Sequence, residues 1–109
     1  MKTNIYKIKT NELNDFISYN GTDKLIVFYK QGCPFCKMQI DCIRDIADKY
    51  KDRINCAICD VTGKTKFIIN NSITGLPTIH IYKNNQLEYN HRSYIESNEL
   101  EKQLNLFLK

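Results

Sequence analysis

The chain has 109 residues, of which 42% are hydrophobic and 26% are charged, with four glycines and two prolines. This length favours one compact domain over residues 1–109, and the composition excludes collagen-like, low-complexity and wholly disordered proteins. Sixteen basic and twelve acidic residues give a net charge of +4, and the basic residues are scattered along the chain, so nucleic-acid binding is not predicted.

The first half of the chain predicts two strand and helix units. Residues 5–8 form a short mixed run that indicates a weak first strand, and apolar residues recur at helical spacing in 13–17. The segment 24–29 is continuous, apolar and rich in β-branched and aromatic residues, as in a central strand covered on both faces. Helical periodicity then extends over 34–50, and Pro34 suits the first turn of a helix. A tight turn therefore joins the central strand to this helix.

The second half predicts a third unit followed by a hairpin. Residues 54–61 are apolar and of strand length, and 64–70 indicate a short helix. Residues 78–82 alternate as a strand, and the pair 84–85, Asn-Asn, is a turn signal. Residues 87–91 can then return as an antiparallel strand.

A closing amphipathic helix is predicted from the apolar positions between Leu100 and Leu108. Asn98 and Glu101 have the spacing of a capping box at its start. The resulting order, β-α-β-α-β-α-β-β-α, predicts the α/β class, with a central mixed β-sheet flanked by helices on both faces.

Membrane contact and secretion are not expected. No apolar stretch reaches the roughly 18 to 20 residues that span a bilayer. The segment from Met1 to Lys7 has charge but no following apolar block of the kind found in secretion signals.

The chain has five cysteines, an odd number, which disfavours a scaffold in which every thiol is paired in a disulfide. We therefore expect a cytoplasmic protein with reduced, catalytic or metal-bound thiols.

The motif Cys33-Pro34-Phe35-Cys36 lies where the central strand meets the next helix. Two thiols at this spacing can close a disulfide with little backbone movement. Unpaired N–H groups and the partial positive charge of a helix N-terminus favour a thiolate at Cys33, which is therefore the candidate nucleophile. Cys36, one turn further in, is expected to be more buried, as suits a resolving thiol. Metal ligation and inert thiols are the alternatives for this motif.

A second marker is Gly75-Leu76-Pro77-Thr78, where a proline directly precedes a strand and a tight turn with a cis bond is possible. Such a bond would expose the Leu76 backbone beside the thiols.

Five pieces of the chain have a combined order and spacing typical of one family: Leu25-Ile26-Val27-Phe28, Cys33-x-x-Cys36-Lys37-Met38, Ile46-Ala47-Asp48-Lys49-Tyr50, Gly75-Leu76-Pro77-Thr78 and Lys83-Asn84-Asn85. Through these pieces the chain resembles the thioredoxin family over nearly its whole length.

The resemblance implies a thioredoxin fold and the activity of a protein-disulfide reductase. By that resemblance, Cys33 attacks a protein disulfide, Cys36 resolves the intermediate, and Leu76-Pro77 pairs with the extended backbone of the substrate and keeps metals from the thiols. It also implies disulfide-containing proteins as substrates, thioredoxin reductase as electron donor, a monomer, and no cofactor or metal held by the domain. The expected substrate-binding residues are Gly32, Pro34, Phe35, Gly75, Leu76, Pro77, Ser93 and Tyr94.

Two departures from the family concern charge beneath the thiols. Val27 stands where many thioredoxins bury an aspartate, and Ile58 stands where the partner lysine is usual. Losing both together is consistent, because an unpaired buried charge is costly. A buried carboxylate can relay a proton to the second cysteine. We therefore expect proton transfer at Cys36 to depend on water or substrate.

Other departures concern the substrate surface. Gly32 replaces a usual tryptophan, Ser93 replaces a usual glycine, and Pro34-Phe35 is more similar to glutaredoxins, which are generally more oxidising. Glutathione-coupled exchange is therefore an alternative. Against it, the chain has no Gly-Gly followed by Asp after the proline to hold glutathione.

Cys56 and Cys59 form a second C-x-x-C, and with the first motif they fit a common zinc pattern. A zinc-binding interaction module is therefore another alternative. Residues three apart on a strand point to opposite faces, however, so these two sulfurs cannot easily share an ion. We expect both to be small buried apolar residues.

Cys42 follows Cys36 by six residues, which predicts a partly exposed position away from the active-site side of the helix. It is either a passive helix residue or a site of regulatory oxidation or of an intermolecular disulfide.

Neither His80 nor His91 has metal-ligand spacing, and no surrounding pattern supports a Cys-His hydrolase. Lys37 either extends a positive surface near the thiols or is an ordinary solvated residue.

Overall fold

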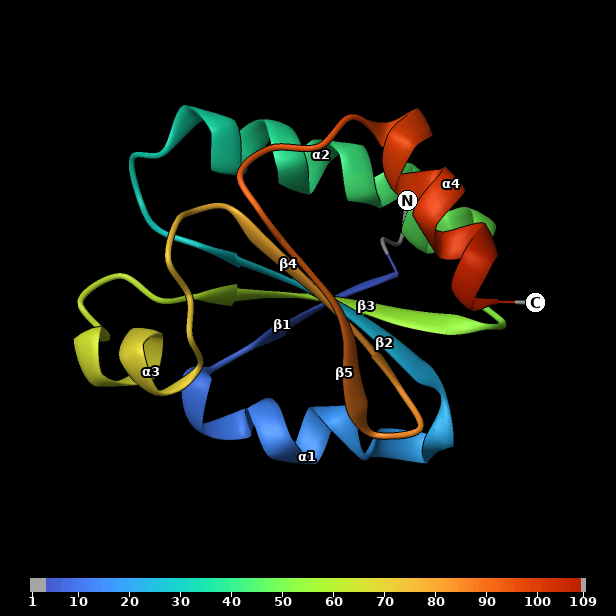
Figure 1. The fold of residues 1–109 in the computed structure, drawn as a ribbon, viewed down its shortest axis with the longest axis horizontal. Helices are drawn as coiled ribbons and strands as arrows, with labels where there is room; N and C mark the ends of the chain where they lie inside the picture. Colours follow the sequence, from blue (N-terminus) through green and yellow to red (C-terminus); the bar gives the residue numbers. More distant parts are fainter. Residues whose placement is uncertain (1–3, 109) are drawn as a thin grey trace.

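The computed structural model describes residues 4–108, so the amino-terminal signal prediction falls partly on residues outside this range. Figure 1 shows the elements in chain order, with short 3-10 turns before and after the first helix. The helices and strands are β1 (Ile5–Ile8), α1 (Leu13–Ile17), β2 (Asp23–Tyr29), α2 (Pro34–Lys49), β3 (Ile54–Asp60), α3 (Thr65–Asn70), β4 (Thr78–Lys83), β5 (Gln86–Arg92) and α4 (Ser97–Phe107). This confirms the predicted alternation of strands and helices.

The strands form one mixed sheet in the order β1-β3-β2-β4-β5. β3 is parallel to both β1 and β2, whereas β4 is antiparallel to β2 and β5 is antiparallel to β4. β2 is therefore the central strand, and Val27 lies between Ile58 on β3 and Ile79 on β4. In the part of the chain that the structure describes, no helix has both the length and the apolar character needed to cross a membrane.

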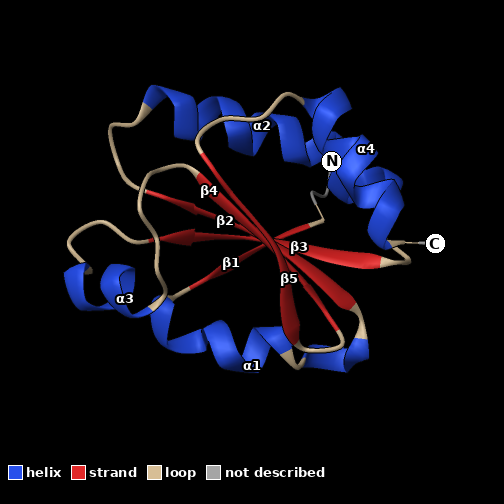
Figure 2. Cartoon of the chain, in the orientation of Figure 1, coloured by secondary structure: helices blue, strands red, loops and turns tan. Residues whose placement is uncertain are grey.

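Both faces of the sheet are covered by helices, as expected from the continuous apolar sequence of β2. Figure 2 shows α2 and α4 on one side of the sheet and α1 and α3 on the other. Leu25 and Val27 pack in the first of these two cores, and Ile26 and Phe28 pack in the second, because successive strand residues point to opposite faces. All four side chains are fully buried.

The hairpin between β4 and β5 turns at the predicted asparagines. Asn84 and Asn85 have φ angles of 54° and 66°, so both adopt the left-handed conformation that a two-residue type I′ turn requires. Asparagine tolerates this conformation better than most residues do.

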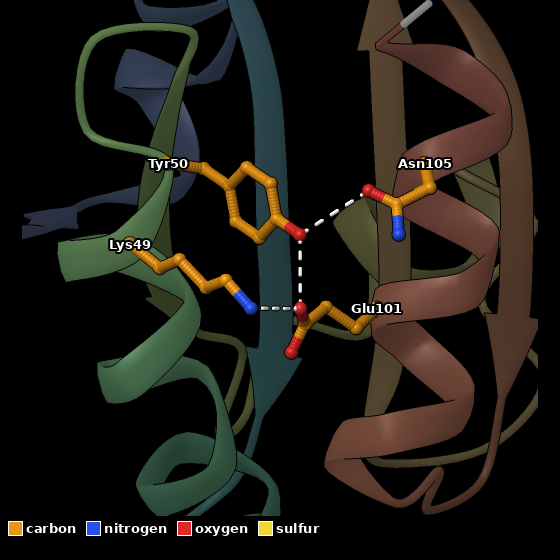
Figure 3. Close-up of polar contacts among 4 residues, drawn as sticks. All are labelled: Lys49, Tyr50, Glu101 and Asn105. Carbon is orange, nitrogen blue, oxygen red and sulfur yellow. Dashed lines mark hydrogen bonds and ion pairs between the residues drawn. The ribbon is translucent and has the colours of Figure 1, made fainter.

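Polar side chains join α2 to α4 (Figure 3). The Glu101 carboxylate lies 2.5 Å from Lys49 Nζ and 3.0 Å from the Tyr50 hydroxyl, which is also 3.2 Å from Asn105 Oδ1. The hydrogen bonds from Lys49 and Tyr50 lower the pKa of Glu101 below its ordinary value.

The predicted capping box at Asn98 and Glu101 is wrong. α4 begins at Ser97 with Glu96 at the N-cap, two residues earlier than that box requires. Asn98 therefore lies inside the first turn, where its side-chain oxygen accepts a hydrogen bond from Glu99 N at 2.9 Å. Glu101 is too far along the helix to cap it and contacts α2 instead.

His80 on β4 is a buried titratable group remote from the cysteines in sequence. Its side chain is 1% exposed and packs edge-on against the ring of Phe28, with 4.9 Å between ring centroids. Nδ1 lies 3.3 Å from the Tyr82 hydroxyl, and Nε2 has no hydrogen-bond partner. Burial disfavours the charged imidazole and lowers the pKa of His80 to about 4.

We predict that His80 destabilises the fold in mild acid. The unfolded chain protonates His80 near its ordinary pKa of 6.5, whereas the folded chain resists protonation down to about 4. Stability from this group is therefore complete above pH 6.5 and is lost as the pH falls towards 4, by about 3 kcal/mol at roughly 1.4 kcal/mol per pKa unit. Urea unfolding at pH 7.5 and pH 4.5 measures the difference.

The matched variants are His80→Phe and His91→Phe, since His91 is only partly buried on β5. His80→Phe should show a much smaller decline with acid, while His91→Phe should decline like the unmodified protein. An undiminished decline in His80→Phe would refute the prediction.

Candidate active site

The Cys33–Cys36 motif lies just beyond the C-terminal end of the central strand β2. β2 ends at Tyr29, and residues 30–33 connect it to α2. Gly32 has a φ of +75°, a left-handed conformation that L side chains rarely adopt. Gln31 anchors the loop to the segment after β3, because its backbone N–H donates to Thr62 Oγ1 at 2.9 Å and its amide donates to Asp60 at 2.7 Å. Hydrogen bonds from Thr62 and Gln31 hold the pKa of Asp60 below its usual value.

Cys33 is the N-cap residue of α2, and Pro34 occupies the first turn. The backbone N–H of Cys36 donates to Cys33 Sγ at 3.2 Å, and that of Lys37 donates to the Cys33 carbonyl at 3.1 Å. A disulfide joins Cys33 to Cys36, whose Cα atoms are 5.2 Å apart.

The two cysteines differ in exposure as predicted. Cys33 is partly exposed, whereas Cys36 is only 1% exposed. An external sulfur can therefore reach Cys33 far more easily than Cys36. The catalytic roles of the two residues remain predictions at this point.

The Leu76-Pro77 bond is cis, as the sequence suggested. The preceding turn is closed by Thr78 Oγ1, which donates to the Gly75 carbonyl at 2.5 Å. Ser93 has a φ of +79°, and its backbone N–H donates to the Pro77 carbonyl at 2.8 Å. The structure thus brings Ser93 next to Pro77, which lies 16 positions earlier in the sequence.

The predicted substrate-binding residues fall into three groups around this end of the sheet. Gly32 and Pro34 line a groove together with both cysteines of the motif. Gly75 and Leu76 line a smaller pocket of about 300 Å³. Of the remaining residues, Phe35 is exposed with its ring centroid 6.4 Å from that of Tyr94, Ser93 is exposed, and Pro77 is buried. Their role in binding a substrate stays a prediction.

Cys42 is absent from the lining of the groove that contains Cys33 and Cys36, in keeping with its predicted position, but it contacts Tyr94. Its sulfur lies 3.2 Å from the hydroxyl of Tyr94, the residue that packs against Phe35. Cys42 and Cys36 lie on different faces of α2, as their spacing of six residues predicts. The segment after β5, which contains Tyr94, passes over the face of α2 that carries Cys42. The hydrogen bond with Cys42 raises the pKa of Tyr94, and burial adds to the shift. Cys42 is partly exposed, as predicted.

Gln39 is a positioning residue that the sequence analysis missed. It is fully buried on α2, where its amide donates to the Ile95 carbonyl at 3.1 Å and accepts from Ile95 N at 2.8 Å. These two bonds tie the segment that contains Ser93 and Tyr94 to the active-site helix. The sequence does contain a signal for this role: Gln39 follows Cys36 by three residues, so a polar side chain lies on the same, buried face of the helix.

Cys56 and Cys59 lie on opposite faces of the sheet, as predicted. Cys56 packs in the core beneath α2 and α4, and Cys59 packs in the core beneath α1 and α3. Burial raises the pKa of Cys56 to about 12 and that of Cys59 to about 11. Over residues 4–108, no three His, Cys, Asp or Glu side chains gather in a way that could hold a metal ion. The two thiols therefore fit the apolar role and not the zinc role.

The two core positions at which the family usually carries charge, Val27 and Ile58, are uncharged. Val27 and Ile58 are direct neighbours in the register of β2 and β3, and their side chains are 0% and 6% exposed. Ile58 also lines the groove that contains the two cysteines. Val27 and Ile58, which replace the aspartate and lysine usual in the family, thus form an apolar pair between β2 and β3.

Comparisons with known proteins agree with this geometry. The family model described as Thioredoxin matches residues 4–106. A thioredoxin from Acetoanaerobium sticklandii is 33% identical over 67 residues, which are 61% of this chain and 64% of that protein. Thioredoxins from Peptoclostridium acidaminophilum and Acidithiobacillus ferridurans are 29% and 31% identical, over 57% and 59% of this chain and 56% and 59% of their own lengths. The alignments therefore span less than two thirds of these relatives.

We predict that Gly32→Ala destabilises the protein by about 1 to 2 kcal/mol, because an L side chain is strained at a φ of +75°. Gly75→Ala is the matched control: Gly75 has no positive φ, and an added Cβ meets no atom within 4 Å at either position. The control should lose no stability and gain up to about 1 kcal/mol from a less flexible unfolded chain. Urea unfolding of the oxidised proteins compares the two, and equal effects would contradict the assignment of strain to Gly32.

Proposed function

Because the chain belongs to the thioredoxin family, we propose that it is a thiol–disulfide oxidoreductase that reduces disulfides in other proteins through Cys33 and Cys36. The observation that supports this most directly is the hydrogen bond from Cys36 N to Cys33 Sγ. In the reduced protein, a donor in this position stabilises the thiolate of Cys33 over its thiol. The partial positive charge of the helix N-terminus acts in the same direction.

The proposed reaction proceeds in two exchange steps. The Cys33 thiolate attacks one sulfur of the substrate disulfide, which forms a mixed disulfide and releases the other substrate sulfur as a thiolate that takes up a proton. Cys36 then loses its proton and attacks Cys33 Sγ, which releases the second substrate sulfur and closes the Cys33–Cys36 disulfide. The dithiol supplies two electrons to the substrate, whose two released thiolates take up two protons: one given up by Cys36 and one from solvent, because Cys33 reacts as the thiolate.

The oxidised form then needs a two-electron reductant. We propose thioredoxin reductase with NADPH as this donor, and folded proteins with accessible disulfides as substrates. The cytoplasm is the proposed compartment, because the partly exposed free thiol of Cys42 would be at risk of pairing with another thiol in an oxidising one. Glutathione is the alternative donor, favoured by the exposed aromatic residue of the Pro34-Phe35 dipeptide.

The function is tested by cysteine variants in an insulin-reduction assay. Cys33→Ser should abolish activity, and Cys36→Ser should accumulate a mixed disulfide with substrate because the resolving thiol is missing. Cys42→Ser keeps a hydroxyl near Tyr94 and should remain active. Thioredoxin reductase with NADPH and glutathione with its reductase are supplied in separate arms to identify the donor.

Alkylation of Cys36→Ser at a series of pH values measures the pKa of Cys33 directly. We expect a value below the ordinary cysteine value of about 8.5. An ordinary value, together with full activity of Cys33→Ser, would refute the proposed function.

We further predict that Val27→Asp accelerates disulfide reduction at neutral pH. A carboxylate at this fully buried position has a raised pKa and can accept the proton of Cys36, which the apolar pair of Val27 and Ile58 cannot. The expected gain is on the order of tenfold.

Val27→Asn is the matched control, because its amide has a similar shape and cannot take up the proton. The two variants and the unmodified protein are compared in insulin reduction from pH 6 to 9. Equal rates for all three would exclude proton relay through this position.

A further inference from the structure

A basic groove lies beside the proposed reactive cysteine. It has a volume of about 610 Å³ and is lined by both Cys33 and Cys36. Four cationic residues from different parts of the fold also line it: Lys7 on β1, Lys30 in the active-site loop, and Lys37 and Arg44 on α2. We call this feature the basic groove.

Negative charge within the basic groove is limited to one carboxylate. Asp41 lines the groove and lies 3.6 Å from Arg44 Nε. In the described part of the chain, Lys7, Lys30 and Lys37 form no ion pair with a carboxylate. Four cations against one anion give the groove a formal charge of +3, compared with +4 for the whole chain. The fold therefore gathers basic residues that are scattered in the sequence.

The remaining lining of the basic groove does not neutralise this charge. Tyr29, Ile40 and Ile58 contribute apolar surface. An anion bound here meets exposed cations at the rim, because Lys7, Lys30 and Lys37 are all exposed. The only carboxylate among the described lining residues of this groove is Asp41, which is also exposed.

The smaller pocket next to Leu76 has a different character. It is lined by Lys30, Ile68, Ile73, Thr74, Gly75 and Leu76, so it is mostly apolar and contains a single cation. Lys30 belongs to both cavities. A polypeptide that reaches Cys33 thus meets strong positive charge in one cavity and apolar surface in the other.

We infer that the basic groove binds an acidic segment that flanks the disulfide of the substrate protein. This inference rests on the proposed function and specifies its substrate class. The groove extends from Lys7 on β1 to the two cysteines. A peptide segment suits it because acidic residues that flank the substrate disulfide in sequence can lie in the groove while the disulfide itself reaches Cys33. Charge complementarity of this kind raises the rate of productive encounters and weakens with salt.

The test uses two peptides with the same internal disulfide, one flanked by glutamates and the other by glutamines. The full-length protein should reduce the acidic peptide with a kcat/KM about tenfold higher at low salt. The difference should vanish near 1 M salt, where the screening length is about 3 Å.

Two double variants locate the effect. Lys7→Gln with Arg44→Gln removes two groove cations and should eliminate most of the preference for the acidic peptide. Lys51→Gln with Lys66→Gln removes the same charge from exposed residues that do not line the groove, and should keep the preference.

Equal reduction of the two peptides by the unmodified protein, or an equal loss of preference in both double variants, would overturn the inference. Reduction of the glutamine peptide separates this failure from failure of the proposed function. If that peptide is reduced, the oxidoreductase function stands without the acidic preference; if neither peptide is reduced, both proposals fall.

Discussion

The arrangement of this site depends on the end of one helix, where the backbone N–H of Cys36 points at the sulfur of Cys33. The first N–H groups of a helix have no partner within the helix and are usually satisfied by an oxygen of Ser, Thr, Asp or Asn. Here a cysteine sulfur takes that place, and Pro34 removes one N–H that would otherwise need a partner. In the proposed mechanism, the contact that caps the helix in the disulfide form is the same contact that would stabilise the Cys33 thiolate once the disulfide opens.

The rest of the fold keeps that helix end in place and leaves it accessible. β2 is covered on both faces, so its end is fixed at the centre of the sheet, and Gln31 ties the following loop to the end of β3. Gln39 fastens α2 to the segment before α4. The side chains at Val27 and Ile58 are apolar, so neither of these buried positions places a charge in the core.

The sequence was sufficient for features that depend on local pattern. The order of the elements, the asparagine turn and the difference in burial between Cys33 and Cys36 follow from periodicity, turn propensity and helix position. Features that depend on tertiary contacts could not be predicted from the sequence. Helical spacing alone could not show that Tyr94 crosses over Cys42, and the basic groove joins residues from β1, a loop and α2 that no local pattern connects. The start of α4 was predicted wrongly because the helix begins two residues before the Asn98 capping pattern requires, after a Glu96 N-cap that makes no side-chain capping hydrogen bond.

Under the proposed function, the charges that would attract an acidic substrate also act on the dithiol itself. A cation near Cys33 stabilises the thiolate, and stabilising the thiolate stabilises the reduced form of the pair, which raises its reduction potential. Lys37 follows the motif directly and lines the groove with both cysteines. Under the proposed function its charge would act in this direction together with the helix end. No buried carboxylate opposes them at Val27, because that position is apolar. For the proposed function, substrate attraction and oxidising strength are therefore physically linked: adding cations to the groove improves encounter with acidic proteins but makes the dithiol a weaker reductant of them.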